Sequence, residues 1–206
     1  MTRRAITYTG FMARWQTGTQ NRLEQAAWAL FLEQGFAETT VPEIAARAGL
    51  TTRTFFRHFA DKREVLFAGD ESVPTFVQHL MAQTPPDVRP VPLILSQLGP
   101  FAETVFGHRR DMLRLRHCII ITDQGLRERE LQKTATLRTA IVDGFVQRGT
   151  DKLTASLVAD LAIMVLGTAL AQWLNSDGPV SLSTAVAEVL AAFKRLTSEV
   201  EPEAVP

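Results

Sequence analysis

The chain has 206 residues, and its 22 Lys and Arg are balanced by 22 Asp and Glu, so the formal net charge of +0 excludes an overall basic character. Hydrophobic residues make up 46% of the chain, enough for a sizeable core, and the single cysteine excludes an intramolecular disulfide framework. Charge is uneven, however, because residues 1–63 hold nine Lys and Arg against five Asp and Glu. A basic head on an acidic body is typical of a DNA-reading domain joined to a second domain.

The first eighteen residues contain three arginines and no apolar run, so we expect a mobile basic arm and no secretory signal. From residue 19 or 21 to Gln34, apolar residues recur at helical spacing, which predicts a supporting helix that Gly35 ends. Its inner face is predicted to consist of Leu23, Ala26, Ala27, Leu30 and Phe31.

Residues 40–62 predict a helix, a tight turn, a second helix and the start of a third. Thr40 and Glu43 form a capping box, and Gly49 is expected to end the first helix in the left-handed conformation. Thr51 can cap the second helix, and Asp61 can cap the third. Two short helices joined by a glycine-containing turn predict a helix-turn-helix, whose second helix enters a DNA major groove.

The second helix divides by spacing into an inner row, with Phe55 and Phe59, and outer rows that reach toward DNA. Arg53 lies in its first turn, where a guanidinium can pair with a guanine edge. Lys62 and the helix N-terminus at Thr40 are placed for phosphate contacts. The predicted DNA-binding residues are Thr40, Thr51, Thr52, Arg53, Thr54, Phe56, Arg57, His58 and Lys62.

From about residue 21 to 66 the chain resembles the tetracycline-repressor (TetR) family of transcriptional regulators. The resemblance is carried by Gly35-Phe36 and then by Thr40, Ile44, Ala45, Ala48, Gly49, Leu50, Thr51, Thr54, Phe55, Phe56, His58, Phe59 and Lys62. Many members have a tyrosine at the place of Phe56, so a hydroxyl contact to phosphate is absent here. The string RTFFRHF, and more weakly residues 126–138, resemble a subgroup similar to the mycofactocin-associated regulators.

The rest of the chain predicts further helices and no strands, so the expected fold is all-α. Helices are expected at 72–83, 92–106 (kinked or broken at Gly99-Pro100), 108–123 and 126–148. The predicted division is a helix-turn-helix domain with its arm at 1–66 and a larger helical effector-binding and dimerisation domain at 67–206.

Residues 155–174 are apolar on nearly all sides, and 181–196 form a second apolar helix. Twenty such residues could span a bilayer, but Asp160, Gln172 and the absence of flanking basic runs argue against a membrane. A helix that is apolar all round is otherwise buried all round. We therefore predict a homodimer through 155–174 and 181–196, and the TetR resemblance implies the same arrangement.

No catalytic motif, metal site or cofactor site is recognisable, so the chain is not expected to be an enzyme. The resemblance implies a pocket for a small-molecule effector in the second domain. Its candidate lining residues are Phe101, Phe106, Leu113, His117, Ile120 and Trp173. The basic cluster Arg109–Arg116 is either a head-group site for an acidic ligand or a solvated face paired with acids. Cys118 is expected to be a buried core thiol.

Taken together, these features predict a cytoplasmic transcriptional regulator that binds a near-palindromic operator. An apolar or amphipathic ligand would release it. The alternative is a DNA-binding dimer of the same fold whose C-terminal domain docks a protein partner.

Overall fold

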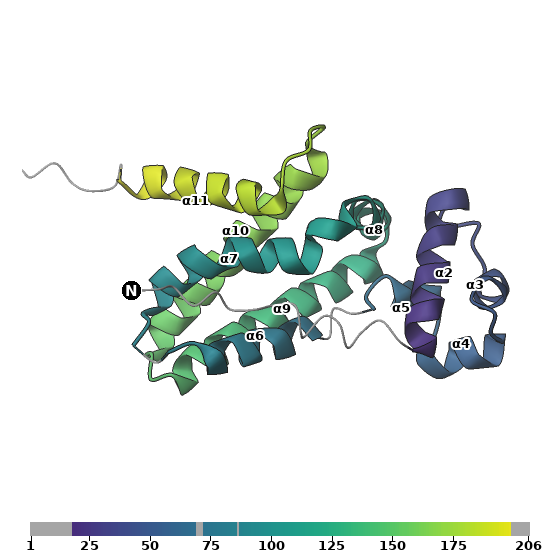
Figure 1. The fold of residues 1–206 in the computed structure, drawn as a ribbon, viewed down its shortest axis with the longest axis horizontal. Helices are drawn as coiled ribbons and strands as arrows, with labels where there is room; N and C mark the ends of the chain where they lie inside the picture. The colour runs from purple at the N-terminus through teal and green to yellow at the C-terminus, as the bar shows by residue number, and fades with distance from the viewer. Residues whose placement is uncertain (1–17, 69–71, 86, 199–206) are drawn as a thin grey trace, which may run out of the picture. The chain divides into compact units, whose positions relative to one another are not determined.

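The computed structural model describes residues 18–68, 72–85 and 87–198, so the predicted basic arm lies almost entirely outside the described residues. These residues form α-helices and no strand, as the sequence predicts (Figure 1). The first helices are α2 (Thr19–Gln34), α3 (Val41–Arg47), α4 (Thr52–His58) and α5 (Lys62–Val65). The later ones are α6 (Ser72–Gln83), α7 (Pro90–Phe106), the 3-10 turn η2 (Gly107–Arg109), α8 (Arg110–Thr122), α9 (Gln124–Gln147), α10 (Lys152–Asn175) and α11 (Leu182–Ser198).

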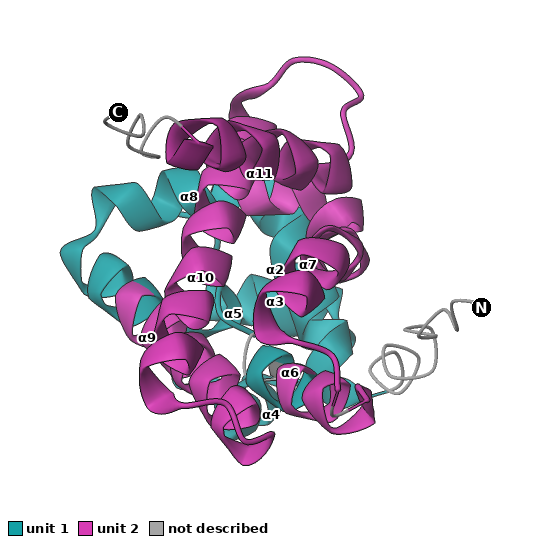
Figure 2. Ribbon diagram, turned by 90° about the vertical axis from the view of Figure 1, so that its left-hand side faces the viewer, with its two compact units in different colours: residues 1–76, 115–130 teal, residues 77–114, 131–206 magenta. Residues whose placement is uncertain are grey.

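The helices group into two compact units, coloured separately in Figure 2. Unit 1 comprises residues 1–76 and 115–130, and unit 2 comprises residues 77–114 and 131–206. Unit 1 thus includes a segment from far along the chain that the predicted division did not assign to it. An independently folding domain of residues 1–66 stays a prediction.

The core of unit 1 is built by α2, α3 and α4 together with the 115–130 segment. Leu23 and Phe31 of α2 are fully buried against Ile44 of α3 and Phe55 of α4. Two residues of the later segment, Ile120 and Leu126, belong to the same cluster. The segment therefore completes the small core of the helix-turn-helix, and we expect it to stabilise that fold.

Two arginines attach the 115–130 segment to the end of α5. The guanidinium carbons of Arg116 and Arg129 lie 5.1 and 4.8 Å from the ring centroid of the buried Phe67. Arg116 also donates to the Leu66 carbonyl at 2.8 Å, and Arg129 pairs with Glu64 at 2.5 Å. These contacts join cation–π attraction to hydrogen bonding, so they fix this segment more firmly than apolar packing alone would.

In unit 2, helices α7, α10 and α11 pack against one another. Helix α7 continues through Pro100, so the break that the sequence allowed at Gly99-Pro100 does not occur. A Cβ at Gly99 would lie 3.0 Å from the Ser183 hydroxyl, so glycine allows α7 and α11 to approach closely here. Ser183 also donates its backbone N–H to Glu103, which ties the first turn of α11 to α7.

Helix α10 has two different faces. Its inner row is buried and includes Ala155, Ala159, Ala162, Val165 and Ala169. Its outer row is exposed although largely apolar, with Leu153 at 72%, Leu157 at 61% and Met164 at 46% exposure. The helix is long and apolar enough to cross a membrane, and 39% of its most apolar stretch is buried within the fold. These values indicate that α10 is a core helix with one face that the chain itself does not cover.

Candidate nucleic-acid interface and apolar cavity

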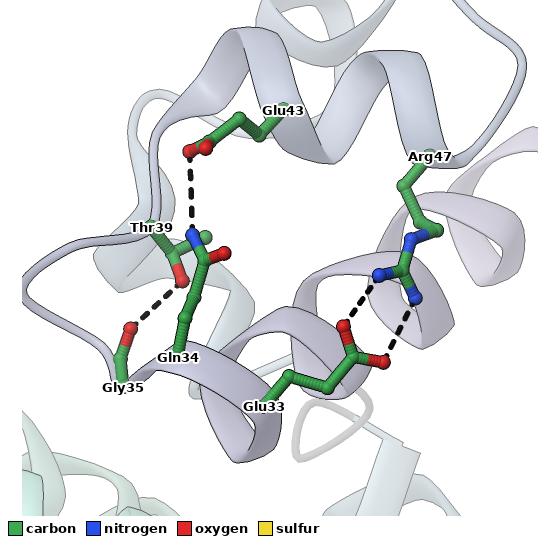
Figure 3. Close-up of polar contacts among 6 residues, drawn as sticks. All are labelled: Glu33, Gln34, Gly35, Thr39, Glu43 and Arg47. Atoms are coloured by element: carbon green, nitrogen blue, oxygen red, sulfur yellow. Dashed lines mark hydrogen bonds and ion pairs between the residues drawn. The ribbon is translucent and has the colours of Figure 1, made fainter.

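The geometry of the helix-turn-helix depends on how the end of α2 is joined to α3. The Thr40 side chain accepts the backbone N–H of Glu43, and the Glu43 carboxylate accepts the backbone N–H of Thr40 at 2.8 Å, so the predicted capping box is confirmed. Arg47 pairs with Glu33 through two hydrogen bonds of 3.0 and 2.5 Å, and Gln34 donates to Glu43 (Figure 3). These bonds draw the two helices together at both ends of α3.

The turn between α3 and α4 depends on Gly49. This residue has a φ of +64°, which confirms the predicted left-handed stop and which residues with a side chain rarely adopt. Arg22 donates to the Ala48 carbonyl at 2.5 Å and so satisfies an orphan acceptor at the end of α3. Thr51 then begins α4 by accepting the N–H of Thr54, as predicted.

Helix α4 buries Phe55 and leaves its other faces free for a ligand. Arg53, Phe56 and Arg57 are exposed, as are Thr51 and Thr52. Phe56 is 58% exposed, and its ring packs edge-on against the ring of Phe55, with centroids 5.6 Å apart. The accessible residues of α4 among those predicted to bind DNA are Thr52, Arg53, Phe56 and Arg57, whereas Thr54 and His58 are half-buried.

Three of the predicted DNA-binding threonines make hydrogen bonds within the fold itself. The hydroxyl of Thr40 bonds the Glu43 carboxylate at 2.7 Å, and the hydroxyls of Thr51 and Thr54 lie 2.9 Å apart. His58 is half-buried and lies 3.5 Å from Arg57. Any phosphate contact by these groups would have to share or replace the bonds that they already make.

Lys62 has a structural position that the sequence did not reveal. Its ammonium group donates to the carbonyls of Phe36, Ala37 and Thr39, at 2.7, 2.9 and 2.8 Å, and lies 4.7 Å from the centroid of the Phe36 ring. The pKa of Lys62 is lowered, chiefly because burial withdraws the ammonium group from water. An ammonium group has three donors, and all three are used within the chain. The predicted phosphate contact of Lys62 would require breaking some of these bonds.

Unit 2 contains an apolar cavity of about 40 Å³ between α6, α7, α9 and α10. Twelve of its thirteen lining residues are apolar, and the other is Gln97. Among the candidate ligand-binding residues, Phe101 lies in the cavity wall. Its neighbour Phe106 packs edge-on against it, with ring centroids 6.4 Å apart, outside the wall.

The other candidate residues lie elsewhere. Trp173 is buried and donates its indole N–H to the Val180 carbonyl, and Ile120 belongs to the core of unit 1. Leu113 is half-buried outside the cavity wall, and His117 is exposed. The sequence did not predict the other lining residues, such as Leu93 and Ile141. They are apolar core residues, and nothing in the sequence distinguishes them from core residues that line no cavity.

The basic cluster of α8 has two kinds of partner: Arg116 pairs with an acid, Glu130, at 2.5 Å, whereas Arg110 and Arg114 bond backbone carbonyls. Arg110 donates to the carbonyls of Trp173, Ser176 and Gly178, and Arg114 donates to Leu174 and Ser176. Both guanidiniums therefore satisfy carbonyls at and beyond the C-terminus of α10, where the helix dipole also favours a positive charge. Glu103, which precedes the cluster by six residues, accepts the Ser183 backbone N–H.

Cys118 differs from expectation as well, because it is exposed. Its place on α8 explains the difference: the helix buries Ile120 in the core of unit 1, and Cys118 lies two residues away, on another side. In the described ranges, no group of three or more His, Cys, Asp or Glu could hold a metal ion.

We predict that Lys62→Met lowers the free energy of unfolding by about 1–3 kcal/mol, because three carbonyls lose a charged donor. Chemical denaturation measures this change, and Arg57→Met is the control, since Arg57 is an exposed cation on the neighbouring helix. If Lys62→Met instead kept full stability and reduced the salt dependence of DNA binding by about one unit per site, Lys62 would be a phosphate contact.

Comparison with known proteins identifies the N-terminal part of the chain. Residues 24–68 match the family model described as bacterial regulatory proteins, tetR family. The chain is 51% identical over 47 residues to the HTH-type transcriptional regulator TcmR of Streptomyces glaucescens, a match that covers 23% of this chain and 21% of TcmR. It is 26% identical over 183 residues to MftR of Mycobacterium tuberculosis, a transcriptional regulator assigned by name to mycofactocin biosynthesis. That match covers 85% of this chain and 89% of MftR.

Solved structures share the fold over most of the chain. NalD, a repressor of a multidrug efflux pump in Pseudomonas aeruginosa, aligns with a TM-score of 0.62 at 18% identity, covering 86% of this chain and 95% of NalD. The TetR-family repressor FadR of Thermus thermophilus, in complex with lauroyl-CoA, aligns with a TM-score of 0.58 at 21% identity, covering 91% and 98%. A SmeT–triclosan complex aligns with a TM-score of 0.57 at 23% identity, covering 85% and 91%.

The family match at residues 24–68 coincides with the helix-turn-helix, and the neighbours share an N-terminal helix-turn-helix and a helical C-terminal part. These neighbours are transcriptional regulators and not enzymes. Residues 24–68 are therefore similar to the DNA-binding part of TetR-family transcriptional regulators, and the fold of the chain is like that of the solved regulators.

Proposed function

We propose that the chain is a homodimeric, ligand-responsive repressor. It acts in the cytoplasm, binds a near-palindromic operator and is released by an apolar or amphipathic small molecule. The observation that carries this proposal is the apolar cavity of unit 2. Cavities lined by apolar side chains and few polar groups are typical of small-molecule sites. That FadR was crystallised with lauroyl-CoA and SmeT with triclosan is consistent with such a role.

A route from ligand to DNA is available within a single helix. Helix α9 carries Leu126 in the core of unit 1, and it carries Leu137 and Ile141 in the cavity wall. At about 40 Å³ the cavity is far smaller than the several hundred Å³ of a typical ligand site, so a ligand must widen it. We infer that the ligand selects a wider packing of these helices, and that α9 passes the change to the helix-turn-helix.

The proposed dimer interface is the outward face of α10 and α11. On α10, Leu153, Leu157 and Met164 are exposed at helical spacing. On α11, the exposed Ala187 and Ala191 provide a surface of small side chains, against which a second helix can pack closely. A pair of such helices from each of two chains would cover the apolar row that a single chain leaves in water.

We predict that Leu157→Arg shifts the dimer toward monomer, raising the dimer dissociation constant at least about 30-fold, because a charge would be buried without a partner. Sedimentation equilibrium measures the constant. The matched control is Leu131→Arg, at an equally exposed leucine of α9 outside the proposed interface. A wild-type chain that sediments as a monomer at micromolar concentration would refute the dimer.

We predict that Arg53→Ala relaxes base preference at one position in each half-site. Arg53 is exposed in the first turn of α4, where a bidentate contact to guanine is worth roughly 1–3 kcal/mol of discrimination. Selection from random DNA would first supply the operator, and a panel of single-base variants would then measure preference. Arg89→Ala, at an exposed arginine of unit 2, is the control. If Arg53→Ala lowered all affinities equally, Arg53 would be a phosphate contact.

The release mechanism makes a thermodynamic prediction. A ligand that weakens operator binding by some factor must itself bind more weakly, by the same factor, when the operator is present. Compounds that shift the melting temperature of the purified chain would be titrated with and without the selected operator. Equal ligand affinities in both titrations would show that the cavity and DNA are uncoupled. That result would favour a C-terminal domain that docks a protein partner.

A further inference from the structure

We propose that the outer face of α10 pairs antiparallel with the same face of the partner's α10, so that Leu157 of each subunit packs against Gly167 of the partner subunit. This inference rests on the homodimer of the proposed function, and it names the surface and the pairing of residues that form it. The two-fold axis would pass this contact at the level of Ala162, which lies equally far along the helix from both residues.

The first argument is the spacing of the exposed residues of α10. Between residues 153 and 171, the exposed residues are one row of six with Thr154 and Thr168 beside it. The members of the row follow one another at alternating intervals of four and three residues, which is the spacing of a seam between two packed helices. The row consists of Leu153, Leu157, Asp160, Met164, Gly167 and Ala171.

The second argument is the order of side-chain sizes along the row. In its first half, Leu153 and Leu157 are 72% and 61% exposed. In its second half, Gly167 and Ala171 leave the helix backbone nearly bare. In a two-fold dimer, a contact between one residue and a different residue of the partner occurs twice with the roles exchanged. Antiparallel pairing therefore sets Leu157 against the partner's Gly167. It also sets Leu153 against the partner's Ala171, so that each large side chain meets a small one.

No neighbour in its own subunit explains Gly167. Glycine disfavours a helix relative to alanine, so a glycine inside a helix calls for a neighbour that approaches closely. Gly99 and Gly144 have such a neighbour, because an added Cβ would lie 3.0 and 2.8 Å from side chains of other helices. At Gly167 an added Cβ would meet nothing within 4 Å. The space above this glycine is therefore open to a large side chain from a second subunit.

Asp160 lies in the middle of the row and favours the antiparallel direction. Its carboxylate accepts two hydrogen bonds from Arg138, of 2.5 and 2.9 Å, so it has a counter-charge within its own subunit. Parallel pairing in register would nevertheless bring the two Asp160 carboxylates face to face, and like charges repel. Antiparallel pairing instead sets Asp160 against the partner's Met164, whose unbranched side chain adapts to its neighbours. The two carboxylates then lie about one helical turn apart.

Cross-linking tests the pairing directly. Cys118→Ser would first remove the exposed native thiol, and Leu157→Cys/Gly167→Cys in that background would be oxidised with copper phenanthroline. We expect a covalent dimer as the main product on a non-reducing gel. A disulfide within one subunit cannot form, because the two positions lie about 15 Å apart along the same helix.

The single variants Leu157→Cys and Gly167→Cys are the matched controls in the same background. Each should stay largely uncross-linked, because its cysteine would lie about 15 Å along the helix from its own copy in the partner. Efficient cross-linking of either single variant would overturn the antiparallel arrangement. A double variant that sediments as a dimer but does not cross-link would overturn the contact between Leu157 and the partner's Gly167.

An exchange of sizes tests the same contact without a disulfide. Gly167→Leu fits the open space of the monomer but sets two leucines against each other in the dimer, so the dimer dissociation constant should rise at least about 10-fold. Leu157→Ala should raise it about 5- to 30-fold, because the apolar contact is lost. Leu157→Ala/Gly167→Leu again sets one large side chain against one small one, and should return the constant to within about 3-fold of wild type. Losses that simply add in this double variant would overturn the inference. Circular dichroism checks that each variant is folded.

The proposed function and this inference fail separately. A dimer that cross-links as stated, but whose operator affinity is unchanged by every compound that shifts its melting temperature, would sustain this inference and overturn ligand-controlled repression. A dimer that such a compound releases from the operator, but in which the cysteine pair and the size exchange both fail, would sustain ligand-controlled repression and overturn this inference. A wild-type chain that sediments as a monomer would overturn both.

Discussion

A single ammonium group holds together the connection on which the DNA-reading helices depend. Lys62 donates hydrogen bonds to the carbonyls of Phe36, Ala37 and Thr39. These carbonyls belong to the connection between α2 and α3 and accept no hydrogen bond from a helix. Such orphan acceptors are costly when they are withdrawn from water. Because Lys62 begins α5, its three bonds tie the end of the helix-turn-helix back to its beginning, and α3 and α4 are held between them. The capping box at Thr40 and the Arg47–Glu33 pair then set how α3 leaves that connection.

Unit 2 uses the same chemistry with arginine. Arg110 and Arg114 satisfy the end of α10, and Arg148 satisfies the connection from α6 to α7. A planar guanidinium presents several donors in a fixed fork, so one side chain can serve three or four carbonyls at once. Two arginines of the basic cluster, Arg110 and Arg114, thus bind the carbonyls at and beyond the end of α10.

Features that arise from neighbours in sequence could be predicted, whereas features that arise from distant segments could not. The capping box at Thr40, the left-handed Gly49 and the inner row of α2 follow from spacing and residue type, and the structure confirms them. The role of Lys62 could not be predicted, because its partners lie 23 to 26 residues earlier and are backbone atoms that any residue would supply. The expectation of a buried Cys118 was wrong for a related reason, since helical periodicity alone does not show which face of α8 meets a neighbour. The cavity could not be predicted either, because its lining residues are of the same types as residues in a closely packed core.

The two faces of α10 link the cavity to the proposed dimer. Ala162 and Leu166 face the cavity, and Leu157 and Met164 face outward on the same helix. The sequence shows only a helix that is apolar all round, because both faces need apolar residues for different reasons. The inner face has small, mostly alanine side chains, so α7 and α11 can pack closely against it, and the outer face carries the larger exposed side chains.

A ligand that widened the cavity would press on the inner face of α10, while the partner subunit of the proposed dimer would hold its outer face. Since packed interfaces resist continuous deformation, α10 would then act as the fixed wall, and the displacement would fall on α6, α7 and α9. Of these, α9 continues into the core of unit 1 at Leu126. In the proposed function, a dimer at the outer face of α10 would thus direct the effect of the ligand toward the DNA-reading helices.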